Sequence, residues 1–149
     1  MPRRPTPNVV PMDSPEDVEA QFYEALRDGD LERVMAVWGD DDEVVCVHPA
    51  GGRVFGPRAV RATFESIFAN GPIPVHAEHV HRVVALGTAV HSVLERIVVP
   101  TAEGSRTAWV TATNVYARTA QGWRMVAHHA SPGSDDAPRD DGPAPSTLH

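Results

Sequence analysis

A histidine that could transfer protons stands at the end of a short apolar segment, at position 48. Residues 45–47 are Val-Cys-Val, which favours a β-strand, and His48-Pro49 followed by glycines indicates that the chain then turns back. An imidazole titrates near neutral pH, so His48 could act as a general acid or base. A strand-end histidine can equally be held by backbone groups or water, and the spacing alone leaves both interpretations open.

Four other histidines, at positions 76, 79, 81 and 91, raise the question of a metal site. On a strand only His79 and His81 share a face, whereas zinc needs three or four ligands. The facing positions on the next predicted strand carry Ser92, Leu94 and Arg96, which are poor ligands. We therefore predict an exposed or interface face here, with no metal and no cofactor.

Charge and composition limit the classes of partner. The formal net charge is -7 for 149 residues, which argues against nucleic acid or an anionic membrane surface. No apolar run is long enough to span a bilayer, and the basic start lacks the apolar stretch of a secretion signal. Cys46 is the single cysteine, so no internal disulfide can form, and its thiol is expected in the core. We predict a cytoplasmic protein.

Helical signals come first along the chain and strand signals follow. Ser14-Pro15 is a helix start, and Val18, Phe22 and Leu26 then share one apolar face. A second helix is predicted over 31–38, and a third from Gly56-Pro57 to Gly71-Pro72. Stretches rich in Val, Thr, Ile and aromatic residues predict four strands, at 75–86, 89–99, 107–118 and 122–130.

This order predicts an α+β fold in which a curved, mostly antiparallel (mixed) sheet wraps around three N-terminal helices as a cone-shaped barrel with a central pocket. The domain is expected to cover residues 14–132. The flanking tails, 1–13 and 133–149, are rich in proline and poor in apolar residues, so we predict that both are disordered.

The element order and several local stretches resemble the superfamily of nuclear transport factor 2, ketosteroid isomerases and SnoaL-like polyketide cyclases. The resemblance extends over residues 14–132. The stretches that carry it are Glu-Ala-Leu-Arg-Asp-Gly-Asp-Leu at 24–31, Trp-Gly-Asp-Asp-Asp at 38–42, Ala-Thr-Asn-Val-Tyr at 112–116, and Gly-Trp-Arg-Met-Val-Ala-His-His-Ala-Ser-Pro at 122–132. This fold hosts isomerases, cyclases, dehydratases and non-catalytic binding or assembly modules, so the resemblance implies a fold and leaves the function open.

The resemblance gives His48 a specific place. Ketosteroid isomerases carry an Asp-Pro-x-Gly loop whose aspartate is the base, and the His-Pro-Ala-Gly stretch that begins at His48 occupies the same place. The match also puts Phe22 where those isomerases have a tyrosine that donates to the developing oxyanion. Phe22 has no hydroxyl, and Tyr23 is expected to point about 100° away around the helix. Ketosteroid isomerase activity is therefore not expected.

Strand alternation sorts the remaining polar residues. A last hairpin loop at 119–122 would place Asn114 opposite Ala127 and put His129 on the inner face, whereas a loop of odd length would put His128 there. A turn at Gly87-Thr88 would place Val84 opposite His91 and Val80 opposite Glu95. The resemblance implies that Glu95, Asn114 and His129 line the pocket.

Two functions fit these residues. In an enzyme acting on a small, largely apolar carbonyl compound, His48 or His129 would be the general base, and Glu95 would orient it or share its proton. The reaction would be an isomerisation, a cyclisation or a dehydration. The alternative is a non-catalytic ligand-binding or dimerisation module. In both cases we expect a homodimer through the outer sheet face, and a pocket lined by Phe22, Trp38, His91, Asn114 and Tyr116, of which Asn114 and Tyr116 would donate to the oxyanion.

Overall fold

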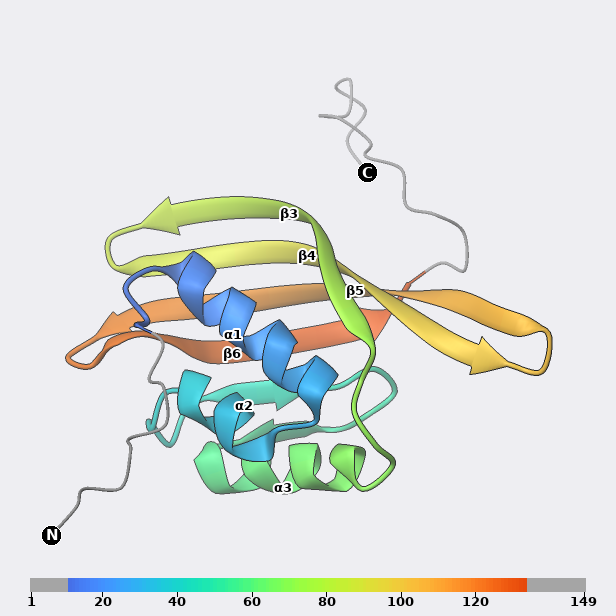
Figure 1. Cartoon of the computed structure of the whole chain (residues 1–149). Coiled ribbons are helices and arrows are strands. Elements are labelled where there is room, and N and C mark those ends of the chain that lie inside the picture. Colours follow the sequence, from blue (N-terminus) through green and yellow to red (C-terminus); the bar gives the residue numbers. More distant parts are fainter. Residues whose placement is uncertain (1–10, 134–149) are drawn as a thin grey trace, which may run out of the picture.

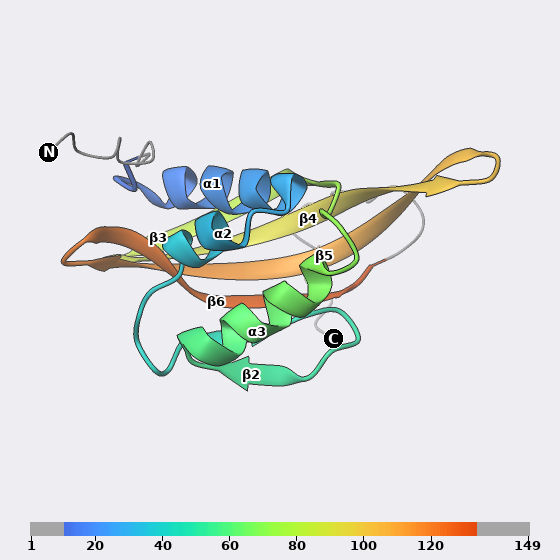
Figure 2. The same cartoon turned by 60° about the horizontal axis from the view of Figure 1, so that its bottom comes forward.

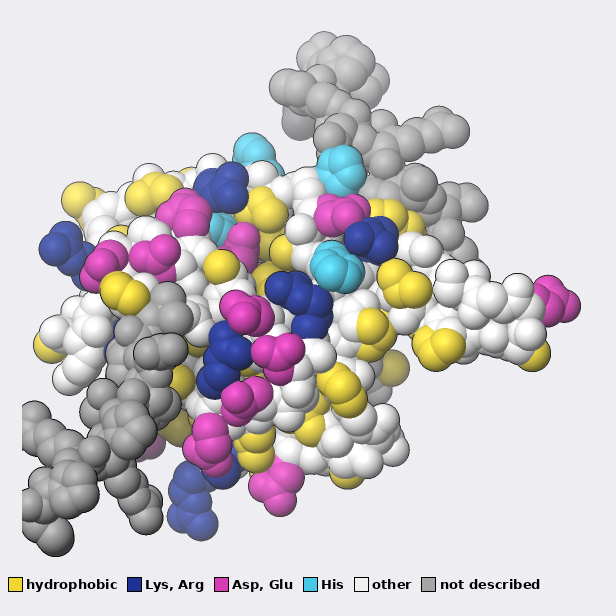
Figure 3. All heavy atoms as spheres, in the orientation of Figure 1, with side chains coloured by type: hydrophobic (Ala, Val, Ile, Leu, Met, Phe, Trp, Pro, Cys, Tyr) yellow, Lys and Arg dark blue, Asp and Glu magenta, His cyan; other side chains and the backbone are white. Residues whose placement is uncertain are grey.

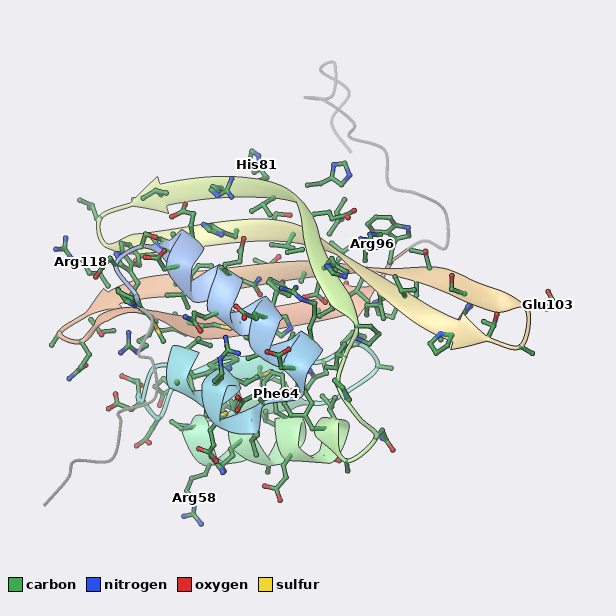
Figure 4. All side chains as sticks on the ribbon, in the orientation of Figure 1. Arg58, Phe64, His81, Arg96, Glu103 and Arg118 are labelled. Atoms are coloured by element: carbon green, nitrogen blue, oxygen red, sulfur yellow. The ribbon has the colours of Figure 1, made fainter. Side chains whose placement is uncertain are left out.

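The computed structural model describes residues 11–133, and most of the two predicted tails lies outside the described residues. Three helices cover one face of a strongly curved sheet, and α1 runs diagonally across the strands (Figure 1). The β4–β5 hairpin, with Glu103 at its tip, extends beyond the helices (Figure 4). The predicted arrangement of helices and sheet is confirmed.

The helices begin and end where the local signals predict. In α1, Pro15–Asp28, the Ser14 side chain accepts a hydrogen bond from the Asp17 amide, and Gly29 ends the helix at a φ of 65°. The second helix, α2 (Leu31–Val37), ends one residue before the predicted end, and α3 covers Pro57–Phe68. Within residues 11–133 no helix is long and apolar enough to cross a membrane.

Six strands form one sheet in the order β2-β1-β6-β5-β4-β3. Neighbouring strands are antiparallel except β1 and β6, which are parallel, so the sheet is mixed. The two edge strands, β2 and β3, do not pair with one another, and the sheet therefore stays open. The strands are β1 (Val45–Val47), β2 (Arg53–Phe55), β3 (Val75–Ala85), β4 (Thr88–Thr101), β5 (Gly104–Thr119) and β6 (Gly122–Pro132).

The core lies between the helices and the concave face of the sheet. Figure 2 shows α1 over the long strands and α3 beside β2. Val18, Phe22 and Leu26 of α1 are buried together with Phe64 of α3, as the apolar spacing predicted. Burial of such side chains is the main stabilising contribution to the fold.

A bulge in β6 changes which residues face the core. The pairing beside the last hairpin is as predicted, but one extra residue, Val126, then shifts the register. Asn114 pairs with His128 rather than with Ala127, so the predicted pairing is wrong. A shift of one residue exchanges the two faces of a strand. His128 is consequently buried, and His129 is exposed on the outer face.

The β3–β4 hairpin turns at Leu86-Gly87, one residue earlier than predicted, because both residues adopt the positive φ angles, 41° and 75°, of a tight hairpin turn. His91 consequently pairs with Arg82. After an irregularity in β3, Glu95 pairs with Ala77. The partners predicted for His91 and Glu95 are therefore wrong, although both side chains are buried on the concave face.

Candidate functional site

Four buried side chains from α1, β4, β5 and β6 form one linear hydrogen-bonded series, here called the Glu95 chain. The Tyr23 hydroxyl donates to Oε2 of Glu95 over 2.8 Å, and Nδ2 of Asn114 donates to the Tyr23 oxygen over 2.9 Å. Oδ1 of Asn114 lies 2.6 Å from Nδ1 of His128. Because that oxygen can only accept, Nδ1 of His128 carries the hydrogen.

Every donor in the Glu95 chain points toward Glu95, so the series supports a negative charge at that end. Burial raises the pKa of Glu95 to about 7, and the hydrogen bond from Tyr23 opposes only part of that rise. Burial also lowers the pKa of His128 to about 3, with smaller contributions from His48 and His129. Near neutral pH, Glu95 can therefore exchange a proton while His128 stays neutral.

His48 lies at the opposite end of this series, where β1 ends. Its Nε2 is 2.9 Å from the Thr63 hydroxyl of α3 and 3.4 Å from the Cys46 sulfur. Its ring meets Phe64 edge-on at 4.8 Å and lies 6.1 Å from the His128 ring. Burial lowers the pKa of His48 and raises that of Cys46 to about 12. His48 is thus a neutral imidazole beside an unreactive thiol.

A second buried group, here called the Glu19 cluster, consists of Glu19, His91 and Tyr116. The Tyr116 hydroxyl donates to Oε2 of Glu19 over 3.0 Å, and Nδ1 of His91 lies 2.6 Å from the same oxygen. The His91 and Tyr116 rings pack edge-on at 4.9 Å. Burial, followed by the Glu19 charge, raises the pKa of Tyr116, so this hydroxyl remains a donor.

The predicted site residues divide between these groups and the core. Phe22 contacts both Tyr23 and His128, with ring centroids 5.1 Å apart in each case. Trp38 packs against Phe64 in the apolar core. Of the remaining predicted residues, Glu95 and Asn114 belong to the Glu95 chain, His48 lies beside its end, His91 and Tyr116 belong to the Glu19 cluster, and His129 is on the opposite face.

Sequence reasoning missed Tyr23 and Glu19, and it left the choice between His128 and His129 to the length of the last hairpin loop. Tyr23 points away from Phe22 around the helix, as expected for adjacent residues, but α1 packs against both α2 and the sheet, so both side chains are buried. A signal was present, since Glu19 and Tyr23 are four residues apart and share one helix face. Within residues 11–133 no three His, Cys, Asp or Glu side chains come together as metal ligands.

A groove of about 420 Å³ opens between α1 and β3. Two of its lining residues, Tyr23 and Glu19, belong to the two buried groups, so the groove lies beside one member of each group. Acidic and basic side chains alternate over α1 on this face of the molecule (Figure 3). The lining residues are Glu16, Glu19, Ala20, Tyr23, Glu24, Arg27, His76, Ala77, Val80 and Arg82.

Comparison with known protein families is consistent with the α+β fold described above. The family model described as SnoaL-like domain matches residues 16–135. No curated protein matches the chain in sequence.

Solved structures similar to this chain include a proposed enzyme and association domains. A proposed calcium/calmodulin-dependent protein kinase type II association domain from Thiobacillus denitrificans is 37% identical over 84% of this chain and 99% of its own, with a TM-score of 0.76. A proposed dehydratase of the NTF2-like family from Streptomyces avermitilis is 32% identical over 78% and 91%, with a TM-score of 0.69. A kinase hub from S. rosetta, 22% identical over 83% and 100% with a TM-score of 0.64, shares the fold.

Proposed function

Since this chain belongs to the SnoaL-like domain family, we propose that it binds a small, largely apolar carbonyl compound and moves a proton on it. The observation that carries the proposal is the Glu95 chain, in which a buried carboxyl group with a pKa of about 7 ends a directed series of donors. A general acid or base works best when its pKa lies near the working pH. We also propose a cytoplasmic location, as predicted from the sequence.

We propose different roles for Glu95 and His48, which lie at the two ends of the site. Ionised Glu95 would take a proton next to the substrate carbonyl, while Tyr23 and Asn114 hold the carboxylate in place. At the other end, Nε2 of His48 lies 2.9 Å from the Thr63 hydroxyl, and in the proposed tautomer Thr63 donates to Nε2 and the imidazole hydrogen is on Nδ1. That N–H would contact a part of the substrate away from the reacting carbonyl, because Tyr23, Asn114 and His128 separate His48 from Glu95. Isomerisation, cyclisation and dehydration all begin with this proton removal, and the 32% identical proposed dehydratase supports this class of chemistry.

The pH dependence of turnover tests the proposal. With a panel of β,γ-unsaturated ketones, β-hydroxy ketones and dicarbonyl compounds, kcat/KM should rise with pH through about 7, because Glu95 must be ionised to act as base. Glu95→Gln should lower turnover on the order of a hundredfold or more, whereas His48→Ala should mainly raise KM. His81→Gln, on the exposed edge of β3, is the matched control and should retain full activity. Full turnover in Glu95→Gln would remove Glu95 from the mechanism.

Association is the second candidate function, and one feature of the outer sheet face favours it. Strand pairing aligns Val83, Val90, Val115 and Ala127 in one apolar row across four strands. Val83 is 55% exposed. The same face carries His81, which points away from α1 (Figure 4). An apolar face of this width suits packing against a second copy of the chain, and the 37% identical relative is a proposed association domain.

Light scattering separates this candidate from the enzyme. A dimer that binds carbonyl compounds without converting them would support the association or binding module. A species of 16.1 kDa at all concentrations would exclude the proposed dimer. It would leave the proton-transfer proposal standing, because every residue of the Glu95 chain comes from one copy.

A further inference from the structure

β3 is a free edge of the sheet, and its last residues are apolar and exposed. Four large hydrophobic side chains are exposed within residues 11–133, and three of them lie at the end of β3 and in the turn that follows: Val83 at 55%, Val84 at 64%, and Leu86, which is fully exposed. β3 is the last strand in the sheet order and forms its upper border in Figure 1. An exposed apolar edge strand is a template for pairing with another strand.

The other edge strand, β2, is protected against such pairing. It has only three residues, Arg53–Phe55, and includes an arginine. Short length and charged side chains are two of the ways in which proteins prevent edge pairing. β3 has eleven residues, and its only irregularity lies between Glu78 and His81. Residues 82–85, Arg-Val-Val-Ala, follow in regular register without a proline, so this part of the edge is open.

Hairpin geometry shows which backbone groups of this segment face outward. Ala85 and Thr88 flank the two-residue turn to β4, and residues in these positions exchange both backbone hydrogen bonds. Hydrogen-bonded and non-hydrogen-bonded pairs alternate along an antiparallel ladder. Val83 therefore also bonds to β4, whereas the N–H and C=O of Arg82 and Val84 point to the free edge. In the sheet of residues 11–133, β3 neighbours β4 alone, so these groups have no strand partner.

A second copy of the same segment fits this edge in one register. Antiparallel pairing about a twofold axis at Val83 places each Arg82 opposite Val84 of the other copy, so that all outward-facing groups of both residues are hydrogen-bonded. An axis at Arg82 would put two arginines opposite one another, which is unfavourable. An axis at Val84 would pair Arg82 with Leu86, whose positive φ of 41° belongs to the turn.

We propose that two copies of this chain pair edge to edge through β3, so that their sheets become one continuous sheet. The Val83 side chains meet at the twofold axis and extend the outer apolar row of Val83, Val90, Val115 and Ala127 into the second copy. This contact differs from packing through the outer face, because edge backbone groups make it. The paired segment is short, so we expect less than about 1,200 Å² of buried surface and a dimer that dissociates on dilution.

Disulfide trapping tests the pairing and its register. In Val83→Cys the two thiols meet at the axis in a non-hydrogen-bonded pair, whose Cα atoms are about 4.5 Å apart, a distance that a disulfide can span. Mild oxidation of a concentrated solution should therefore give a covalent dimer on a non-reducing gel. Cys46 is buried, so it contributes no background.

Val84→Cys is the matched control. In this register the two Val84 Cα atoms are more than about 7 Å apart, which is too far for a disulfide, so this variant should stay monomeric. No covalent dimer in Val83→Cys, or an equal yield in Val84→Cys, would overturn the proposal.

Two second changes in the Val83→Cys background separate edge pairing from packing through the outer face, on which Val83 also lies. Val84→Pro removes an N–H that faces the free edge and no hydrogen bond to β4, and it should abolish most of the covalent dimer. Val115→Lys places a charge in the middle of the outer face and should leave the yield unchanged. The opposite result, loss with Val115→Lys and retention with Val84→Pro, would assign the contact to the outer face.

Amide hydrogen exchange tests the same contact in the unmodified protein. The Val84 amide faces solvent in the monomer, so its exchange should slow as the protein concentration rises. The Val83 amide, which already bonds to β4, should exchange at a rate that depends much less on concentration. A rate at Val84 that is independent of concentration would overturn edge pairing, whatever the behaviour of the variants.

Discussion

The Glu95 chain and the Glu19 cluster lie in the same interior, but their hydrogen bonds are arranged differently. In the Glu95 chain the carboxylate is a terminus that accepts from Tyr23, while Tyr23 and Asn114 occupy the middle. In the Glu19 cluster the carboxylate is the centre and accepts from two donors. Glutamates of equal burial can therefore have different chemistry, because the number and position of donors decide how well each negative charge is supported.

The two hydrogen-bond arrangements suggest different roles for Glu95 and Glu19. A terminal carboxylate with one donor is easily protonated and can take part in proton transfer. A central carboxylate with two donors holds α1 to β4 and β5 and fixes the orientation of His91. The comparison leads to three predictions on stability. Among the acids, the larger loss of stability is expected in the Glu19 cluster. Among the tyrosines, it is expected in the Glu95 chain.

The largest effect is expected from replacing the central acid. Glu19→Leu leaves two buried donors without an acceptor and should lower the free energy of unfolding by about 4 kcal/mol. Glu95→Leu removes the acceptor of one donor, the Tyr23 hydroxyl, which still accepts from Asn114, and it also removes a poorly supported carboxylate, so its cost should be about 1 kcal/mol. Urea denaturation at pH 7 measures both. An equal loss in the two variants would show that the two carboxylates do not differ in this way.

The second largest effect is the pH dependence of the free energy of unfolding that Glu95 causes. Folding raises the pKa of Glu95 from 4.5 to about 7, so the native state holds a proton that the unfolded state has lost in this range. The contribution of Glu95 to stability is therefore lost as pH rises from about 4.5 through about 7. By pH 8, Glu95→Gln should be more stable than the wild type by roughly 3 kcal/mol, from about 1.4 kcal/mol for each pKa unit.

The measurement is the difference in free energy of unfolding between wild type and Glu95→Gln at pH 5 and pH 8. His128 contributes with the opposite sign, since its lowered pKa costs stability as pH falls below its usual value of 6.5. His128 is present in both proteins, so this contribution largely cancels in the difference. A difference that does not grow between pH 5 and pH 8 would show that Glu95 titrates normally.

The smallest effect distinguishes the two tyrosines. Tyr23→Phe removes the donor to Glu95 and the acceptor of Asn114, and should cost about 2 kcal/mol. Tyr116→Phe removes one donor from Glu19, which keeps His91, and should cost about 1 kcal/mol. Thermal unfolding of both variants at pH 7 measures the difference. A greater loss of stability in Tyr116→Phe than in Tyr23→Phe would contradict this difference between the Glu95 chain and the Glu19 cluster.

The elements of the fold were largely predictable because their signals are local. Ser14-Pro15 starts α1 through a side-chain cap and a restricted backbone, and both effects lie within one helical turn. The candidate site was predictable only in part. His48, Glu95 and Asn114 were recognised, and the structure brings them to one region, whereas Tyr23 and Glu19 were not.

The choice between His128 and His129 shows why the site was harder to predict. Alternation along β6 is counted from the hairpin, and one additional residue, Val126, reverses every later position. The bulge lies where Gly39 donates to the Met125 carbonyl and Trp38 forms a bridge with Met125. Contacts from a segment more than eighty residues earlier accompany the bulge, and no pattern within β6 reports them.

The sequence by itself therefore determined the α+β class, the ends of the helices and the position of His48 at a strand end. These depend on backbone preferences and apolar periodicity, which act over a few residues. Only the tertiary structure decided which histidine enters the core, that Tyr23 is buried beside Phe22, and that the buried acids form a chain and a cluster. These outcomes depend on strand register and on the two-sided packing of α1, and both arise from contacts between segments distant in the chain.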